Sequence, residues 1–166
     1  EDVVAKAKQL LDVNVQAGDF LKYEFDEPYD VFCMWDTIEH LQEPHRFVEK
    51  ISDNIADGGL FAVTTGDIGS LNARLRGKKW RQIHPPTHLQ YFSEDTLARL
   101  LEKYGFDIVH VSHPGSYMSL NTIVYIIFVI KNNMPGVYRA LKKTGLLDQK
   151  LYVNMFDYVY MIGRKR

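Results

Sequence analysis

The chain has 166 residues, of which 46% are apolar and 25% are charged, values typical of one soluble globular domain. Twenty Lys and Arg residues against 21 Asp and Glu residues give a formal net charge of −1, so bulk charge does not drive the protein onto nucleic acid or an anionic membrane. The single cysteine, Cys33, excludes an internal disulfide and any CxxC metal or redox site, and it fits a reducing compartment.

Neither the start of the chain nor its most apolar run has the features of a targeting or membrane segment. The chain opens on Glu1 and Asp2, without a basic region or an apolar region of a signal peptide, so we expect a cytoplasmic protein. Residues 122–130 are the most apolar run, far short of the roughly 20 residues that cross a bilayer. We therefore expect a buried helix or strand there, and no stable membrane insertion.

The first part of the chain alternates helical and extended patterns. Apolar residues at helical spacing predict a helix over residues 2–11, and residues 13–18 form a short β-rich run. Residues 29–35 are almost continuously apolar, which is typical of a strand covered on both faces. A proline suited to a first helical turn opens a predicted helix over residues 44–55, and residues 60–65 predict another apolar strand.

The clearest helix signal in the chain lies between Ser93 and Gly105. Ser93 is suited to cap the N-terminus of this helix, and Gly105 is suited to end it. The other elements predicted here are a loop-rich stretch (66–91), a strand (106–111), two helices (117–131 and 135–144) and a closing strand (150–163). The alternation of helices and strands along the whole chain predicts an α/β domain with a mainly parallel sheet.

Four stretches, in order along the chain, resemble one known family. Residues 29–44, which include Trp35-Asp36 and Glu39-His40, and residues 57–60 resemble the central block of class I S-adenosylmethionine-dependent methyltransferases. The Glu-His pair is similar to the branch that includes ubiquinone-biosynthesis O-methyltransferases and sugar methyltransferases. Residues 86–97 resemble the P-x-H-x-x-x-F-S-x-x-T-L signature of that branch, and residues 154–157 resemble the closing strand of its sugar-specific members.

The resemblance implies a Rossmann-like methyltransferase sheet with flanking helices, truncated at the N-terminus. Residues 1–114 would form the later portion of the core, and residues 115–166 a helical extension and closing strand of the same domain. The glycine-rich cofactor loop of the family, its first strand and the acidic residue that ends its second strand have no counterpart in this sequence. We therefore expect the edge of the strand at residues 31–34 to be covered by repacking, by a neighbouring chain or by further residues.

The resemblance also implies S-adenosylmethionine as the cofactor and names four residues that would bind it. Asp19 would accept a hydrogen bond from the adenine amino group, and Phe20 would cover the ring. Trp35 and Asp36 would face the methionine end, where a carboxylate can hold the ammonium group. A turn Asp with a core Phe, and an N-cap role for Asp36, are the alternatives.

Three residues are candidates for the chemistry of methyl transfer. His88 is the best candidate for a base on the acceptor side, and His40 can also accept a proton from a hydroxyl. Glu39 could bind an acceptor hydroxyl or a divalent ion. The alternatives are a local capping or packing pair for Glu39 and His40, and a structural histidine for His88. His84 and His88 have zinc-like spacing, but two prolines between them prevent a continuous helix, so no metal site is predicted.

A run of basic residues lies in the loop-rich stretch. A planar Arg can hold a phosphate and Trp80 could stack on a ring, which suits a nucleotide-sugar, a lipid-linked phosphate or a membrane surface; a solvated face is the alternative. The aromatic content is too low to indicate nucleic acid. The run consists of Arg74, Arg76, Lys78, Lys79 and Arg81.

Two functional hypotheses follow from these observations. The first is methyl transfer to oxygen or carbon of a small-molecule acceptor, such as a sugar or an isoprenoid-quinone-like compound, with no nucleic acid partner. The second is a non-catalytic methyltransferase-like remnant that binds a partner or an anionic ligand. The sequence is compatible with a homodimer.

Overall fold

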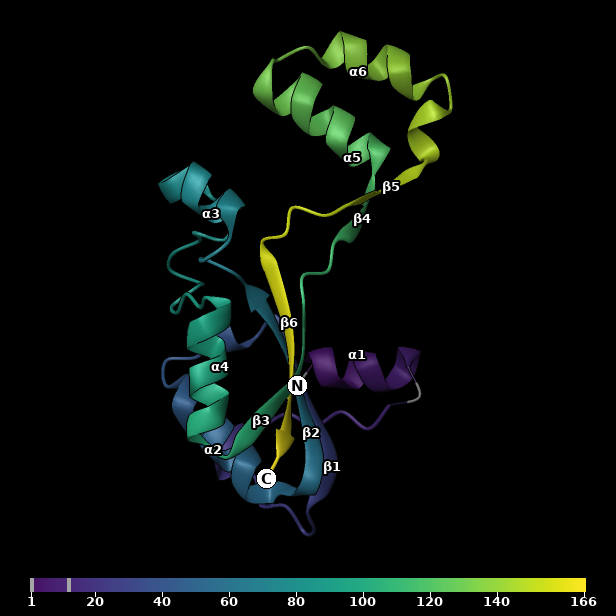
Figure 1. Ribbon diagram of the computed structural model, residues 1–166. Helices are drawn as coiled ribbons and strands as arrows, with labels where there is room; N and C mark the ends of the chain where they lie inside the picture. Colours follow the sequence, from purple (N-terminus) through teal and green to yellow (C-terminus); the bar gives the residue numbers. More distant parts are fainter. Residues whose placement is uncertain (1, 12) are drawn as a thin grey trace.

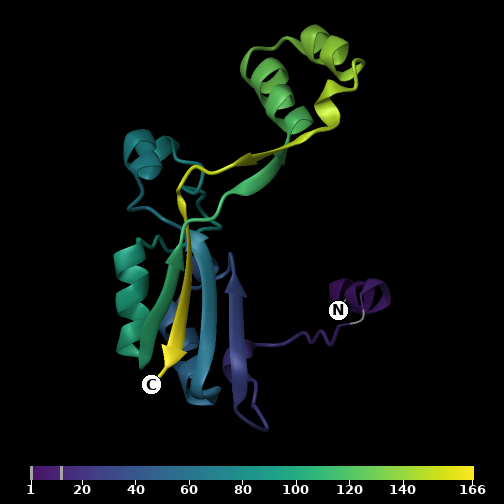
Figure 2. The ribbon, with the colours of Figure 1, turned by 45° about the vertical axis from the view of Figure 1, so that its right-hand side comes forward.

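A four-stranded sheet forms the body of the molecule in this computed structural model, which describes residues 2–11 and 13–166 (Figures 1 and 2). The order of the strands is β1-β2-β6-β3. β1 (Tyr29–Trp35) pairs in parallel with β2 (Ile55–Gly66). β6 (Tyr158–Lys165) is antiparallel to both of its neighbours, β2 and β3 (Phe106–Ser112). Three of the four strands therefore run in one direction, as the sequence predicts.

Two helices cover one face of the sheet. α2 (Pro44–Asn54) and α4 (Glu94–Lys103) lie side by side against this face, and together with the strands they enclose the main apolar core (Figure 2). Burial of this apolar surface is the main stabilising contribution to the body. The fully buried members of the core include Ile38, Val48, Phe61, Val63, Leu97, Leu101, Phe106, Val159 and Met161.

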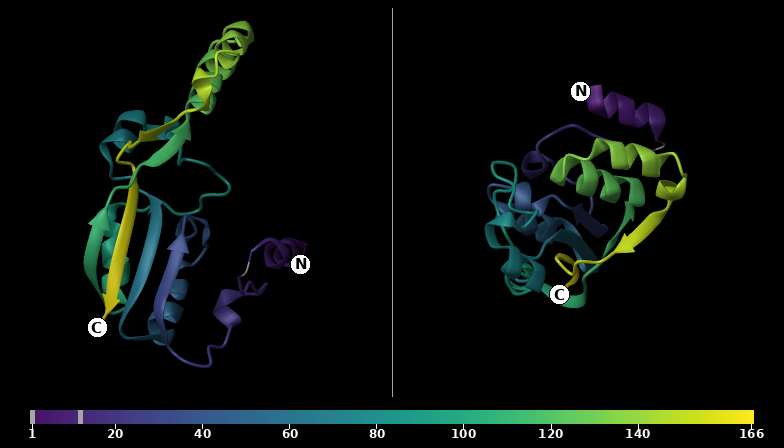
Figure 3. Two further views of the ribbon diagram at one scale, coloured as in Figure 1. Left: turned by 90° about the vertical axis from the view of Figure 1, so that its right-hand side faces the viewer. Right: turned by 90° about the horizontal axis from the view of Figure 1, so that it is seen from above.

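A second unit projects from the sheet, at the end where β1, β2 and β3 finish (Figures 1 and 3). Its base is an antiparallel ribbon of β4 (Ser116–Ser119) and β5 (Lys150–Val153). We call residues 116–153 the helical hairpin. Between its two strands it contains α5 (Leu120–Tyr125), the π-helical segment η4 (Ile126–Lys131), α6 (Pro135–Lys142) and the 3-10 turn η5 (Leu146–Asp148).

The remaining elements are short or lie apart from the sheet. α1 (Asp2–Leu10) stands away from the sheet (Figure 2). Among the described residues, no helix is both long enough and apolar enough to cross a bilayer. The other short elements are η1 (Phe20–Lys22), η2 (Ile38–His40), α3 (Leu71–Arg76) and η3 (Gly77–Lys79).

The structure corrects three of the predicted elements. Residues 13–17 form no strand, because no other described strand lies beside them to accept their hydrogen bonds. The stretch 117–131 begins with β4 rather than with a helix, and the predicted burial of residues 122–130 is wrong, since none of them is buried. The closing strand over residues 150–163 is divided into β5 and β6 by a bend, where Phe156 has a positive φ of 51°.

The strand edge that we expected to be covered belongs to β1, at one side of the sheet. Within the described residues, β1 pairs only with β2, so the expected repacking over this edge is not seen. Val31 is 53% exposed and Trp35 is 52% exposed, and the thiol of Cys33 is also exposed. Their exposure leaves this edge and the neighbouring sheet surface accessible.

Candidate functional site

The candidate site lies where β1 and β2 end, because ligands of open α/β sheets bind beyond the carboxyl ends of the strands. Asp36 follows β1 directly and has a positive φ of 45°, an uncommon conformation for a residue other than glycine. Its backbone N–H donates to the carbonyl of Thr64 at 3.2 Å, and Thr64 Oγ1 donates to Asp36 Oδ1 at 3.0 Å. These bonds to the adjacent strand fix the carboxylate. Thr37, not Asp36, occupies the N-cap position of η2.

The structure brings together the three residues predicted to take part in methyl transfer. Side-chain atoms of Glu39, His40 and His88 that could bind a metal all lie within 4.8 Å of one another. The rings of His40 and His88 meet edge to face, with centroids 4.7 Å apart. Glu39 is buried, and its Oε2 accepts a hydrogen bond from Thr65 Oγ1 at 2.9 Å. These residue types also bind divalent cations, although the sequence predicted no metal site.

The loop that carries His88 is held against the end of β1 by hydrogen bonds. His40 Nδ1 lies 2.7 Å from the carbonyl oxygen of Thr87. Because a carbonyl can only accept, Nδ1 carries the proton, and Nε2 of a neutral His40 is left as the acceptor. The carbonyl of Glu39 accepts from the backbone N–H groups of Leu89 and Gln90. The geometry therefore leaves one imidazole nitrogen able to take a proton.

His84 belongs to the internal structure of this loop. Thr87 Oγ1 donates to the carbonyl of His84 at 2.8 Å, so Thr87 Oγ1 accepts from His84 Nδ1 at 2.6 Å. The peptide between Pro85 and Pro86 is cis. The ring of His84 lies 5.8 Å from that of His88 between centroids.

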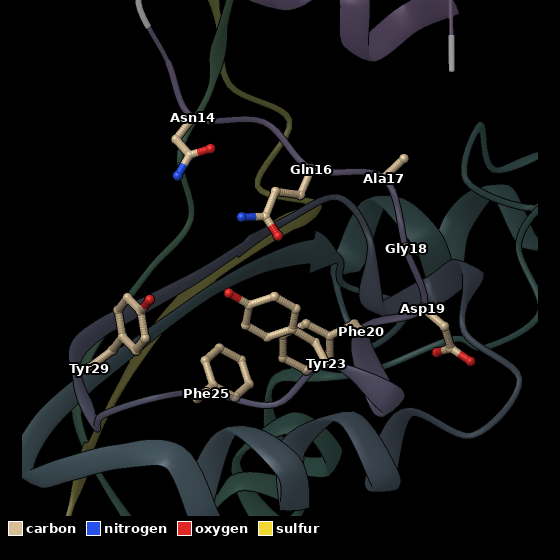
Figure 4. A pocket seen from close by; sticks show the side chains of 9 residues that line it. All are labelled: Asn14, Gln16, Ala17, Gly18, Asp19, Phe20, Tyr23, Phe25 and Tyr29. Atoms are coloured by element: carbon tan, nitrogen blue, oxygen red, sulfur yellow. The ribbon is translucent and has the colours of Figure 1, made fainter.

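The first two residues predicted to bind the cofactor lie at a different pocket. Asp19 caps η1 by accepting from Leu21 N at 3.1 Å, and it pairs with Lys22 at 3.4 Å. The ring of Phe20 stacks on Phe47, with centroids 5.6 Å apart. Asp19 and Phe20 line a pocket of about 450 Å³ together with aromatic residues (Figure 4). These aromatic residues are Tyr23, Phe25 and Tyr29.

Only part of the predicted cofactor set shares one pocket. Phe20 and Trp35 both line a second hollow of about 400 Å³, beside Phe47 and β1. Asp36 lines a third pocket, of about 280 Å³, between the end of the sheet and the base of the helical hairpin. Asp19 and Asp36 therefore line different pockets, and the structure does not bring them into one cavity.

Arg81 of the basic run and its neighbour Trp80 belong to a buried cluster around Asp157. Asp157 is 2% exposed, and it accepts from Trp80 Nε1 at 2.9 Å, Asn72 Nδ2 at 2.7 Å and Arg81 at 3.1 Å. Burial raises the pKa of Asp157, but the bonds from Trp80 and Arg81, the Arg81 charge and the bond from Asn72 outweigh it and lower the pKa below its usual value. Trp80 is itself buried, so the predicted stacking of its ring on a ligand is wrong.

The pocket beside Asp36 is lined by acidic and basic side chains and by a tyrosine hydroxyl. It is lined by Asp36, Arg81, Asp157 and Tyr158, and by residues at the base of the helical hairpin. Burial raises the pKa of Tyr158, as do the charges of Asp36 and Glu39, whereas a hydrogen bond from Gln82 and the charge of Arg81 oppose the rise. Tyr158 therefore stays protonated at neutral pH and can donate a hydrogen bond.

Several residues of the site carried no sequence signal that assigned them a role. Thr64 and Thr65 end an apolar strand, which is the expected place for a ligand site, but threonines are common there. Asp157 is a single acidic residue whose role depends on partners up to 85 positions away.

Comparisons with known proteins agree with this architecture. A methyltransferase domain family matches residues 3–111. No curated protein matches the chain. A SAM-dependent methyltransferase of Thermotoga maritima is similar in structure, with 19% identity and a TM-score of 0.55 over 90% of this chain and 62% of that chain. A SAM-dependent methyltransferase of Archaeoglobus fulgidus has 17% identity and a TM-score of 0.61 over 99% of this chain and 72% of that one.

A third similar structure contains a bound cofactor product. The N-methyltransferase NodS of Bradyrhizobium japonicum, in complex with S-adenosyl-L-homocysteine, has 11% identity and a TM-score of 0.51, and the match covers 97% of this chain and 58% of that one. The chain thus spans less than two thirds of the Thermotoga and Bradyrhizobium proteins. With the family match over most of its length, the chain belongs to the methyltransferase domain family, and it shares the fold of SAM-dependent methyltransferases.

Proposed function

We propose that this protein transfers a methyl group from S-adenosylmethionine to oxygen or carbon of a small-molecule acceptor, such as a sugar or an isoprenoid-quinone-like compound, in the cytoplasm. The observation that carries the proposal is the grouping of Glu39, His40 and His88 at the carboxyl ends of β1 and β2. Two imidazoles beside a buried carboxylate, at the edge where such folds bind ligands, are suited to activate a hydroxyl.

Four residues would hold the cofactor, and their chemistry fits it. The carboxylate of Asp36, fixed by Thr64, is suited to accept hydrogen bonds from the methionine ammonium group. Trp35 and Phe20 present aromatic surface in one hollow, which is suited to cover apolar parts of the cofactor. Asp19 would accept from the adenine amino group. When bound, S-adenosylmethionine supplies the methyl group from its sulfonium centre.

The acceptor would be activated by the histidine pair. His88 would remove the hydroxyl proton as the methyl group is transferred, and His40 Nε2 is the second candidate acceptor of that proton. Glu39 would bind a second hydroxyl of the acceptor or stabilise a protonated imidazole. Methyl transfer is an in-line displacement, so the main task of these groups is to align the acceptor oxygen with the methyl carbon.

Cofactor binding and catalysis can be tested separately in the full-length protein. Calorimetry with S-adenosylhomocysteine should show binding, and Asp36→Asn should weaken it. His88→Gln should lower kcat by about 10²-fold or more, the usual contribution of general base catalysis, with little change in affinity for S-adenosylhomocysteine. His45→Gln, at an exposed histidine on α2, is the matched control and should retain activity.

The outcome also decides between the two functional hypotheses. If S-adenosylhomocysteine does not bind, the proposed enzyme activity is wrong, and a non-catalytic domain becomes the better interpretation. If it binds but His88→Gln and His40→Gln both keep full activity on a methylated acceptor, the proposed role of the histidine pair is wrong.

A further inference from the structure

The helical hairpin leaves nearly all of its apolar side chains exposed or half-buried. Of its described residues, only Leu147 is buried. Eight consecutive apolar residues, 123–130, run through α5 and η4, and none of them is buried. Ile130 is 65% exposed and Ile127 is 42% exposed. A helix that is apolar all round is normally found in a protein core or in lipid. We therefore expect this surface to contact a partner molecule.

The apolar surface continues toward the body through the base of the hairpin. Leu71 and Leu75 on α3 are 72% and 78% exposed. Together with Met155 and Phe156 they line a shallow hollow of about 310 Å³. α3 and the helical hairpin lie at the same end of the sheet (Figures 1 and 2). We call residues 67–92 and 113–156 the distal end of the molecule.

The distal end is strongly basic although the whole chain is nearly neutral. It contains ten of the 20 Lys and Arg residues but only two of the 21 acidic residues, Asp67 and Asp148. The distal end therefore has a formal charge of +8, and the rest of the chain has −9. The basic residues of the hairpin itself are Lys131, Arg139, Lys142, Lys143 and Lys150.

We propose that the distal end docks on the surface of an anionic lipid bilayer. Exposed apolar side chains on the hairpin, such as Ile127, Ile130 and Met134, would enter the boundary between headgroups and acyl chains. The neighbouring Lys and Arg residues would contact the acidic headgroups. Basic residues beside exposed apolar residues are also found in segments that bind at the interface of anionic membranes.

The charge of the distal end and the length of its apolar run favour a membrane surface over a second copy of the chain or insertion across the bilayer. A second copy of this chain, docked through the same surface, would bring two ends of charge +8 together, which costs free energy. An eight-residue apolar run on a helix is about 12 Å long, well short of the roughly 30 Å of a hydrocarbon core, so the hairpin would lie at the surface rather than cross the bilayer.

Co-sedimentation of the full-length protein with vesicles tests the proposal. The protein should bind vesicles that contain phosphatidylglycerol, bind vesicles of phosphatidylcholine alone much more weakly, and be released by raised salt. Lys142→Gln with Lys143→Gln should weaken binding to the anionic vesicles about 25-fold, because each basic residue near such a surface contributes roughly fivefold. Arg99→Gln with Lys103→Gln on α4, in the body, is the matched control and should bind as the wild type does.

Substitution of an exposed apolar residue distinguishes insertion of side chains into the bilayer from simple charge attraction. Ile130→Ser should weaken vesicle binding by roughly tenfold at both low and high salt, because it removes buried apolar area. Equal binding to both kinds of vesicle, absence of binding, or equal losses in the α4 control would overturn the proposal. A second result would also overturn it. If the protein does not bind vesicles, and light scattering shows a dimer that Ile130→Ser dissociates, the partner of this surface is a second copy of the chain.

Discussion

Two buried carboxylates near the carboxyl ends of the strands have different surroundings. Asp157 accepts from Trp80 and Asn72 and pairs with Arg81, so its charge is compensated within the protein. Glu39 accepts from the neutral hydroxyl of Thr65 and lies beside two histidines. A carboxylate with compensated charge stabilises the fold, whereas one beside imidazoles is better placed for proton transfer.

Asp157→Asn should destabilise the protein by about 1–3 kcal/mol at pH 7, because an amide cannot accept from all the donors that Asp157 now satisfies. The folded pKa of Asp157 is lowered, so its contribution is complete above the unfolded value of about 3.9 and is lost as the pH falls through the folded pKa. Urea unfolding at pH 7 and at lower pH should show the difference between variant and wild type shrinking in acid.

Asp107→Asn serves as the control for this measurement. Asp107 is largely exposed, and its carboxylate lies 3.6 Å from Arg166 at the surface. Its substitution should change the free energy of unfolding by less than about 1 kcal/mol. A loss as large as that of Asp157→Asn would show that burial and hydrogen bonding are not the cause.

The helices of the body and of the hairpin differ in how their ends are formed. α4 begins with a capping box, in which Ser93 Oγ accepts from Thr96 N and Thr96 Oγ1 accepts from Ser93 N. Ser119 occupies the N-cap of α5 but makes no side-chain cap hydrogen bond. The local signals that define α4 are visible in the sequence, and the helix was predicted correctly for that reason.

Ser93→Ala should therefore lower the free energy of unfolding by about 1 kcal/mol, the usual value of an N-cap hydrogen bond. Ser119→Ala replaces the same residue type at the same helix position without losing such a bond, and its effect should be within a few tenths of a kcal/mol. Chemical denaturation of the two variants beside the wild type measures both. Equal losses would contradict the role assigned to the capping box.

At the scale of the whole molecule, the body and the helical hairpin differ in packing. β2 and β6 lie in the interior of the sheet, and their inward side chains, such as Phe61 and Met161, are fully buried. The hairpin buries only Leu147 among its described residues. Segments with few buried apolar contacts open with lower free energy than the core.

Hydrogen exchange followed by mass spectrometry should resolve this difference. Amides of α5 and α6 should exchange on the order of 10²-fold faster than those in the middle of β2 and β6, because local opening exposes them without disrupting the sheet. Vesicles that contain phosphatidylglycerol should slow exchange in the hairpin and leave the sheet unchanged. Equal protection in both units without vesicles would contradict the prediction.

The sequence alone predicted the elements whose signals are local and the family that their order resembles. The strands β1 and β2 follow from apolar runs, and α2 and α4 follow from helical spacing and end residues. The motifs from Trp35 to His40 and from Pro86 to Leu97 carried the resemblance. These features depend on neighbouring residues, whose hydrogen bonds and side-chain spacing are fixed by the period of a helix or strand.

Only the tertiary structure decided which distant residues meet and which apolar residues remain exposed. His40 and Thr87 are 47 positions apart, and Trp80 and Asp157 are 77 apart, yet each pair is joined by a hydrogen bond. The apolar run at residues 123–130 was expected in a core and is on the surface instead. Contacts of this kind depend on the order of the strands and on the packing of the loops, and no local pattern in the sequence encodes them.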